Sequence, residues 1–142
     1  MALTENQEEI LVINWWNEHC KDYNLPEIAL AHVRNEEPSA QKRAFNAKMG
    51  VRSGFPDLIL TVPKGQYHGL FIELKRESVY SKKNPLAGLS ENQITFKDFL
   101  TSQGYLSVVC YGHHHAIRTI EAYLTRNFYC WLCGQGQTNG VL

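Results

Sequence analysis

Two short apolar segments near the middle of the chain each carry an acidic residue, and the second segment also carries a lysine. Asp57 stands near the start of PDLILTV, and Glu73 and Lys75 stand two positions apart in GLFIELK. Both segments have the apolar composition of strands, and side chains alternate between the two faces of a strand. Glu73 and Lys75 therefore share one face, and antiparallel pairing of the segments would bring Asp57 opposite them. Charge is costly where a buried strand would carry Val or Leu, so this grouping predicts a chemical role.

Two carboxylates at close range repel each other unless a cation lies between them. Mg²⁺ prefers oxygen ligands and is usually held by carboxylates together with water and substrate phosphate. The carbonyl of Leu74, between Glu73 and Lys75, is a possible further ligand, and Lys75 could orient the attacking water or stabilise charge on a phosphate. These are the components of metal-assisted phosphodiester hydrolysis. The alternative interpretation is a structural ion pair between neighbouring strands.

The charge of the chain is unevenly distributed. Its 14 basic and 14 acidic residues cancel, but residues 42–83 hold nine basic and three acidic residues, a net charge of +6. Two of those three acids are Asp57 and Glu73. A basic central segment predicts contact with nucleic-acid phosphates, although an ordinary solvated surface is the alternative. The residues expected to bind DNA are Lys48, Arg52, Arg76, Lys82 and Lys83.

Caps, periodicity and turn residues predict the elements that must position these side chains. Helices are expected at about 4–22, 39–49, 90–104 and 113–126, and strands at about 28–34, 56–62, 69–75 and 105–111. This order predicts an α/β fold with a mixed sheet flanked by helices. We expect a single domain over residues 1–142, with a core at about 4–126 and a C-terminal extension at 127–142. No membrane-spanning segment or signal peptide is evident, so a soluble, cytoplasmic protein is expected.

The first predicted helix supplies two further acids. At 100° per residue, Glu5, Glu9, Val12 and Trp16 fall in one stripe, so two carboxylates extend an otherwise apolar face. The buried side of this helix is expected to comprise Ile10, Ile13, Trp16 and Cys20.

Cysteine and histidine offer a weaker signal. Cys130 and Cys133 have the CxxC spacing of zinc or redox sites, and Cys20 and Cys110 are isolated. A zinc site needs two further ligands, and the dense histidines, residues 113–115, open a predicted helix. We interpret the cysteines as plain thiols and the histidines as a surface feature.

Three segments carry a resemblance to a known family: GVRSGFPDLIL, GLFIELKRE and LSENQITFKDFLTSQGYLSVVCYG. Together they resemble the VRR-NUC family of the PD-(D/E)xK nuclease superfamily, over about residues 4–124. The resemblance implies a restriction-endonuclease-like fold in which Asp57, Glu73 and the Leu74 carbonyl bind metal and Lys75 is the catalytic lysine.

The resemblance also implies roles for residues on two helices. Glu5 matches the acid of the family's first helix, whereas the residue four positions on, often Gln in the family, is Glu9 here; both are predicted metal-site residues. Gln93 matches a glutamine close to the catalytic site, although Ser90-Glu-Asn-Gln93 is also a capping box.

The resulting prediction is a Mg²⁺- or Mn²⁺-dependent DNA endonuclease whose site is completed by Glu5, Glu9 and Gln93. The small size resembles stand-alone members of phage and bacterial type, which resemble Holliday-junction resolvases. This implies a homodimer that prefers four-way junctions, because two-fold symmetry presents two sites at matched spacing. The alternatives are a less selective nuclease that cuts flaps or duplex DNA, and a non-catalytic nucleic-acid-binding module.

Overall fold

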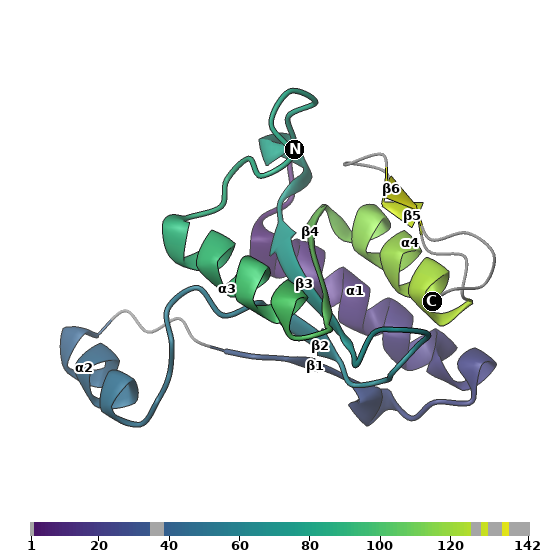
Figure 1. Ribbon diagram of the computed structural model, residues 1–142, viewed down its shortest axis with the longest axis horizontal. Helices are drawn as coiled ribbons and strands as arrows, with labels where there is room; N and C mark the ends of the chain where they lie inside the picture. Colours follow the sequence, from purple (N-terminus) through teal and green to yellow (C-terminus); the bar gives the residue numbers. More distant parts are fainter. Residues whose placement is uncertain (1, 35–38, 126–128, 131–134, 137–142) are drawn as a thin grey trace.

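A four-stranded mixed sheet forms the centre of the computed structural model, which describes residues 2–34, 39–125, 129–130 and 135–136 (Figure 1). The strands are β1 (Leu30–His32), β2 (Leu58–Leu60), β3 (Leu70–Lys75) and β4 (Leu106–Tyr111), in spatial order β1-β2-β3-β4. The pairs β1–β2 and β2–β3 are antiparallel, and β3–β4 is parallel. The predicted α/β fold with a mixed sheet is confirmed.

The described residues form four α-helices close to the predicted positions. They are α1 (Glu5–His19), α2 (Ala40–Lys48), α3 (Glu91–Ser102) and α4 (His113–Leu124). Helices α1, α3 and α4 pack against the sheet, and α2 lies apart from it (Figure 1). Short 3₁₀ helices occupy Cys20–Tyr23, Glu27–Ala29 and Glu77–Val79, the first of them continuing α1. The side chains of Thr4, Ser39 and Ser90 accept the N-terminal amides of α1, α2 and α3, as the capping signals predict.

The C-terminal extension contains a two-stranded antiparallel sheet of β5 (Tyr129–Cys130) and β6 (Gln135–Gly136). Cys133, the second cysteine of the CxxC pair, lies outside the described residues, as does most of the predicted extension. No helix in the described ranges is long and apolar enough to cross a membrane.

The hydrophobic core lies between one face of the sheet and helices α1 and α4. Leu70, Ile72 and Leu74 point into it from β3, as strand alternation predicts, and meet Trp16 of α1 and Ile120 of α4 in one buried cluster. The opposite face of β3 is covered from the side of α3. There Phe55 makes edge-to-face contacts with Phe71 of β3 and Phe96 of α3. Strand β3, which carries Glu73 and Lys75, is therefore packed on both faces.

The buried side of α1 differs from the prediction at one position. Ile10 is 58% exposed, whereas Val12 and Trp16 are fully buried and Cys20 is 5% exposed. At 100° per residue Ile10 lies about 120° around the helix from Trp16, so it falls outside the stripe centred on Val12 and Trp16. The residue that takes the remaining buried position is Glu8, with an exposure of 2%.

Glu8 explains how α4 begins. Gly112, at the N-cap of α4, has no side chain that could accept a hydrogen bond from the helix. The Glu8 carboxylate replaces such a cap: its Oε2 accepts the His113 backbone N–H and lies 2.7 Å from His113 Nδ1. His115 Nδ1 accepts the Tyr111 N–H at 3.1 Å. The interpretation of the histidine triplet as a surface feature is therefore wrong for His113 and His115, and holds for the exposed His114.

Candidate active site

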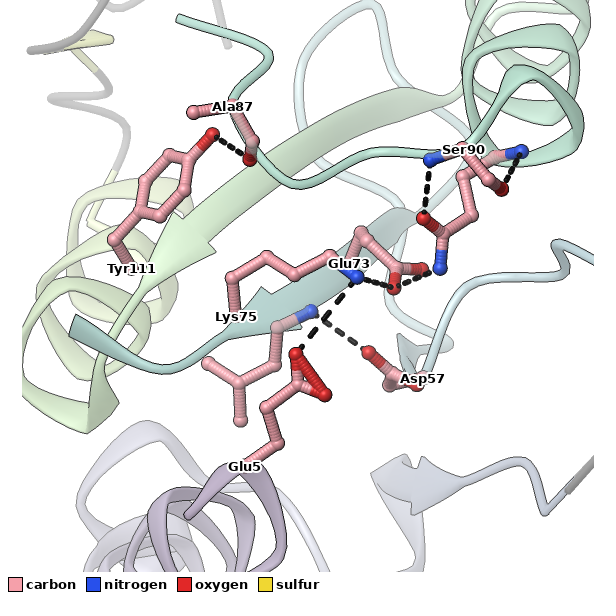
Figure 2. A network of polar contacts seen from close by, with 9 residues as sticks. Glu5, Asp57, Glu73, Lys75, Ala87, Ser90 and Tyr111 are labelled. Carbon is pink, nitrogen blue, oxygen red and sulfur yellow. Dashed lines mark hydrogen bonds and ion pairs between the residues drawn. The ribbon is translucent and has the colours of Figure 1, made fainter. Parts of the chain in front are cut away.

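The pairing of β2 with β3 places Asp57 beside the end of β3. Leu58 pairs with Ile72, so the residue before Leu58 lies opposite the residues that follow Ile72. Asp57 Oδ2 accepts the backbone N–H of Leu74 at 2.8 Å (Figure 2). This bond fixes the carboxylate at the strand edge. Because the N–H and C=O of a strand residue point to the same neighbouring strand, the Leu74 carbonyl lies on the Asp57 side as well.

Glu73 is held in place by helix α3. Gln93 Nε2 donates to Glu73 Oε1 at 2.8 Å, and Gln93 Oε1 accepts the Ser90 N–H at 2.9 Å. Gln93 therefore has both of the roles predicted from the sequence: its side chain completes the capping box of α3 and contacts Glu73. The cap fixes the side chain that orients Glu73.

The second oxygen of Glu73 is the exceptional feature of the site. Glu73 is 8% exposed, and its Oε2 accepts no hydrogen bond from the described part of the chain. Its polar neighbour is the carboxyl group of Asp57. Burial, with the Asp57 charge as the next cause, raises the pKa of Glu73 from 4.5 to about 8. Burial also raises the pKa of Asp57, although the hydrogen bond from the Leu74 N–H acts to lower it.

Lys75 supplies the nearby positive charge. Its Nζ lies 3.7 Å from Glu73 Oε1 and 3.8 Å from Glu5 Oε1, between the end of β3 and the start of α1 (Figure 2). Glu9, the second acid predicted from α1, lies one turn further along and its Oε1 is 2.7 Å from His32 Nδ1 on β1. The structure thus brings Glu5 to Lys75 and pairs Glu9 with His32.

Gly54 allows the segment before Asp57 to approach α3 closely. Its φ is +87°, and a Cβ atom at this position would lie 2.6–2.8 Å from the backbone of Asn92 and Gln93. Both the positive φ and the contact require glycine. The Asp57 segment and the residue that holds Glu73 are therefore joined by direct backbone packing.

These groups open into a cleft of about 370 Å³. Its walls come from α1, α2, the segment before β2, the end of β3 and the start of α3; they include Glu5, Arg43, Asn46, Asp57, Glu73, Lys75 and Gln93. Arg43 and Asn46 of α2 were not predicted as site residues. The available sequence signal was the absence of acids in residues 38–56, which contain four basic residues.

The residues predicted to bind DNA are not part of the lining of this cleft. Arg76 lines a neighbouring cavity of about 400 Å³. Lys48 on α2, Arg52 before β2, and Lys82 and Lys83 in the loop before α3 are exposed. None of these five residues belongs to the lining of the 370 Å³ cleft.

The donor atoms fit a hard divalent cation. A buried carboxylate oxygen without a hydrogen-bond donor, a second carboxyl group beside it and a backbone carbonyl on the same side are ligands of the kind that Mg²⁺ takes. Within the described ranges, no three His, Cys, Asp or Glu side chains form a group that could hold an ion by themselves. Such an ion would therefore complete its coordination with water and substrate oxygens, as Mg²⁺ commonly does.

A mixed sheet with the Asp57, Glu73 and Lys75 set at the end of its central hairpin defines the PD-(D/E)xK class of nucleases. Within that class the chain belongs to the VRR-NUC domain family, whose sequence model matches residues 2–114. A solved structure described as a VRR_NUC domain protein is similar, with 27% sequence identity and a TM-score of 0.72, over 88% of this chain and 91% of the other. No curated protein matches the sequence. The family supports a DNA nuclease.

Proposed function

We propose that this protein is a Mg²⁺- or Mn²⁺-dependent endonuclease that hydrolyses phosphodiester bonds in DNA inside the cell. The observation that carries the proposal is the buried pair of Glu73 and Asp57 carboxyl groups, in which Glu73 Oε2 accepts no hydrogen bond from an N–H group of the described residues. Burying two carboxyl groups against each other is costly to the fold, because both lose water and both cannot be ionised at close range without a cation. A divalent cation held by Asp57, Glu73 and the Leu74 carbonyl would satisfy both groups.

Lewis-acid activation of the phosphate and of the attacking water is the chemistry that such an ion supplies when bound. The Lys75 ammonium group would stabilise the negative charge that develops on the phosphate oxygens, or orient the attacking water. Gln93 holds Glu73 Oε1 and the Leu74 N–H holds Asp57 Oδ2, so each carboxyl group keeps its remaining oxygen available. Hydrolysis of this type would leave a 5′-phosphate and a 3′-hydroxyl.

Of the two acids on α1, Glu5 is better placed than Glu9 to act in the site. Glu5 Oε1 lies 3.8 Å from Lys75 Nζ, whereas Glu9 forms an ion-pair contact with His32. We propose that Glu5 orients Lys75 or a water at the metal site, and that Glu9 acts through His32, whose charge also affects Asp57.

We further propose that the substrate is a four-way DNA junction and that the protein acts as a homodimer. A junction presents two strands related by two-fold symmetry, and a symmetric dimer of this 16.3 kDa chain would cut both. The exposed Lys48, Arg52, Lys82 and Lys83, with Arg76, would hold the arms through their phosphates.

The test compares a labelled immobile four-way junction with a linear duplex of the same sequence, each with Mg²⁺, Mn²⁺ or EDTA. We expect paired, symmetric nicks in the junction, little cutting of the duplex, no cutting in EDTA, and strongly reduced cutting by Lys75→Ala. Sedimentation of the protein alone should give twice the chain mass. Equal cutting of both substrates would support the less selective nuclease, and binding without cutting in either metal would support the non-catalytic module.

A further inference from the structure

Helix α2 is a wall of the catalytic cleft that packs little against the rest of the protein. None of its residues is buried, and Figure 1 shows it set apart from the sheet and from the other helices. A nine-residue helix is marginally stable in water by itself, because most of the stability of a helix in a protein comes from packing against another surface. Residues 38–56, which contain α2, carry four basic residues and no acid.

The two sides of α2 differ. Arg43, Asn46 and Ala47, at helical spacing, line the cleft that contains Asp57 and Glu73. Lys42 is adjacent in sequence but is not part of the cleft lining, since successive helix residues point about 100° apart. Arg43 is therefore the basic residue of α2 that faces the catalytic groups.

The cleft continues past Lys75 on its other side. The second cavity, of about 400 Å³, is lined by Thr4, Glu5, Asn6, Lys75, Arg76, Val79 and Gly88. Glu5 and Lys75 line both cavities, so the two spaces adjoin at the catalytic lysine. Arg43 lines only the first of these cavities, and Arg76 lines only the second.

We propose that these two cavities form a single track for one DNA strand, with Arg43 of α2 as a positioning residue that binds a phosphate on one side of the scissile linkage. Arg76 binds a phosphate on the other side, and Lys75 lies between them at the linkage that is cut. The proposal rests on the proposed nuclease function. A guanidinium group suits this task because it binds phosphate oxygens in a bidentate manner.

The occupant that this surface favours is a nucleic-acid strand rather than a second copy of the chain. The basic, acid-free composition of residues 38–56 is complementary to phosphates. A second copy would instead use Phe45 and Met49, which are 62% and 69% exposed on the same helix and are absent from the cleft lining. In this arrangement, the bound DNA strand contacts the side of α2 that carries Arg43.

The experiment uses labelled four-way junctions in which one phosphate at a time, in the strand that is cut, is replaced by a neutral methylphosphonate. Binding is measured by fluorescence anisotropy in EDTA, and cleavage separately in Mn²⁺. The proteins are wild type, Arg43→Gln, Arg43→Lys, Arg76→Gln and the matched control Lys42→Gln, which removes the same charge from the neighbouring position of α2.

We expect Arg43→Gln to weaken binding roughly tenfold, Arg43→Lys to recover part of this loss, and Lys42→Gln to change binding less than about twofold. In wild type, methylphosphonates on both sides of the cut should weaken binding. In Arg43→Gln, a methylphosphonate on one side of the cut should no longer weaken binding. In Arg76→Gln, the same should hold for a methylphosphonate on the other side of the cut.

Equal losses in Arg43→Gln and Lys42→Gln would overturn the proposal, as would interference confined to one side of the cut. A change in oligomeric state with Phe45→Ser but unchanged binding in Arg43→Gln would assign α2 to a second copy instead. If methylphosphonates on both sides weaken binding but neither Mg²⁺ nor Mn²⁺ supports cleavage, the proposed DNA track is supported and the proposed nuclease function is refuted. Cleavage by Arg43→Gln with wild-type KM would leave the function intact and refute the track.

Discussion

Replacing Glu73 with glutamine should stabilise the metal-free protein. The pKa of Glu73 rises from 4.5 to about 8 in the folded chain. One pKa unit corresponds to about 1.4 kcal/mol, and pH 7 lies about 2.5 units above the ordinary value, so retaining the proton costs the fold about 3 kcal/mol at pH 7. Glutamine removes this cost, keeps an oxygen for Gln93 Nε2 and offers an N–H to the Asp57 carboxyl group.

The sign of the pH dependence follows from the same shift. A raised pKa means that the folded state holds a proton that the unfolded state releases, so wild-type stability falls as pH rises from about 4.5 to about 8. This fall should be reduced in Glu73→Gln, and the difference between the two proteins should grow across that range. At pH 7 the variant should melt on the order of 8 °C higher.

The assay is thermal unfolding in EDTA at several pH values between 4.5 and 8. Glu91→Gln is the matched control, because Glu91 is exposed in the first turn of α3 and should shift the midpoint by less than about 2 °C. A lower midpoint for Glu73→Gln, or a difference that does not vary with pH, would refute the reasoning that Glu73 is held at a cost to stability.

Three further predictions test other parts of the structure. Lys75→Ala should reduce the rate of cleavage on the order of 10²–10³-fold while calorimetric Mn²⁺ uptake persists, and loss of uptake would contradict its assignment to the phosphate or water. Gly54→Ala should destabilise the protein by about 1–3 kcal/mol in denaturant unfolding, since its Cβ would meet the backbone of Asn92; an unchanged midpoint would show that the contact can relax. Burial lowers the pKa of His115 below 6.5. The folded protein should therefore lose stability as the pH falls from 6.5 toward that lowered pKa. His115→Gln should lessen this acid sensitivity and the exposed His114→Gln should not; equal acid profiles for wild type and both variants would contradict the assignment.

Much of the site could be predicted because strand alternation is a local rule. The two-residue spacing of Glu73 and Lys75 fixes their common face, and the turn residues between the two strands predict that β2 and β3 pair as antiparallel neighbours. Asp57 then has a determined place beside Leu74. The caps of α1 and α3 were equally local, since Thr4 and Ser90 each bond to a residue three positions away.

The residues that escaped prediction depend on contacts between distant segments. Glu8 begins α4 through a bond to His113, 105 positions away, and a helical wheel of α1 cannot show that a carboxylate is needed there. Arg43 lines the cleft because α2 borders residues of α1, β3 and α3 that are distant from it in the sequence. The separation of Glu5 from Glu9 likewise depends on His32 of β1, which pairs with Glu9 across elements. In each case the deciding partner comes from another part of the fold.

The most direct test of the central claim is calorimetric titration of Mn²⁺ into wild type, Asp57→Asn and the control Asp98→Asn. Asp98 is exposed on α3, so its substitution makes the same chemical change away from the cleft. We predict uptake of Mn²⁺ by wild type and by Asp98→Asn and its loss in Asp57→Asn. Equal uptake by all three proteins, or none by wild type, would contradict the claim that Asp57 and Glu73 form a divalent-metal site.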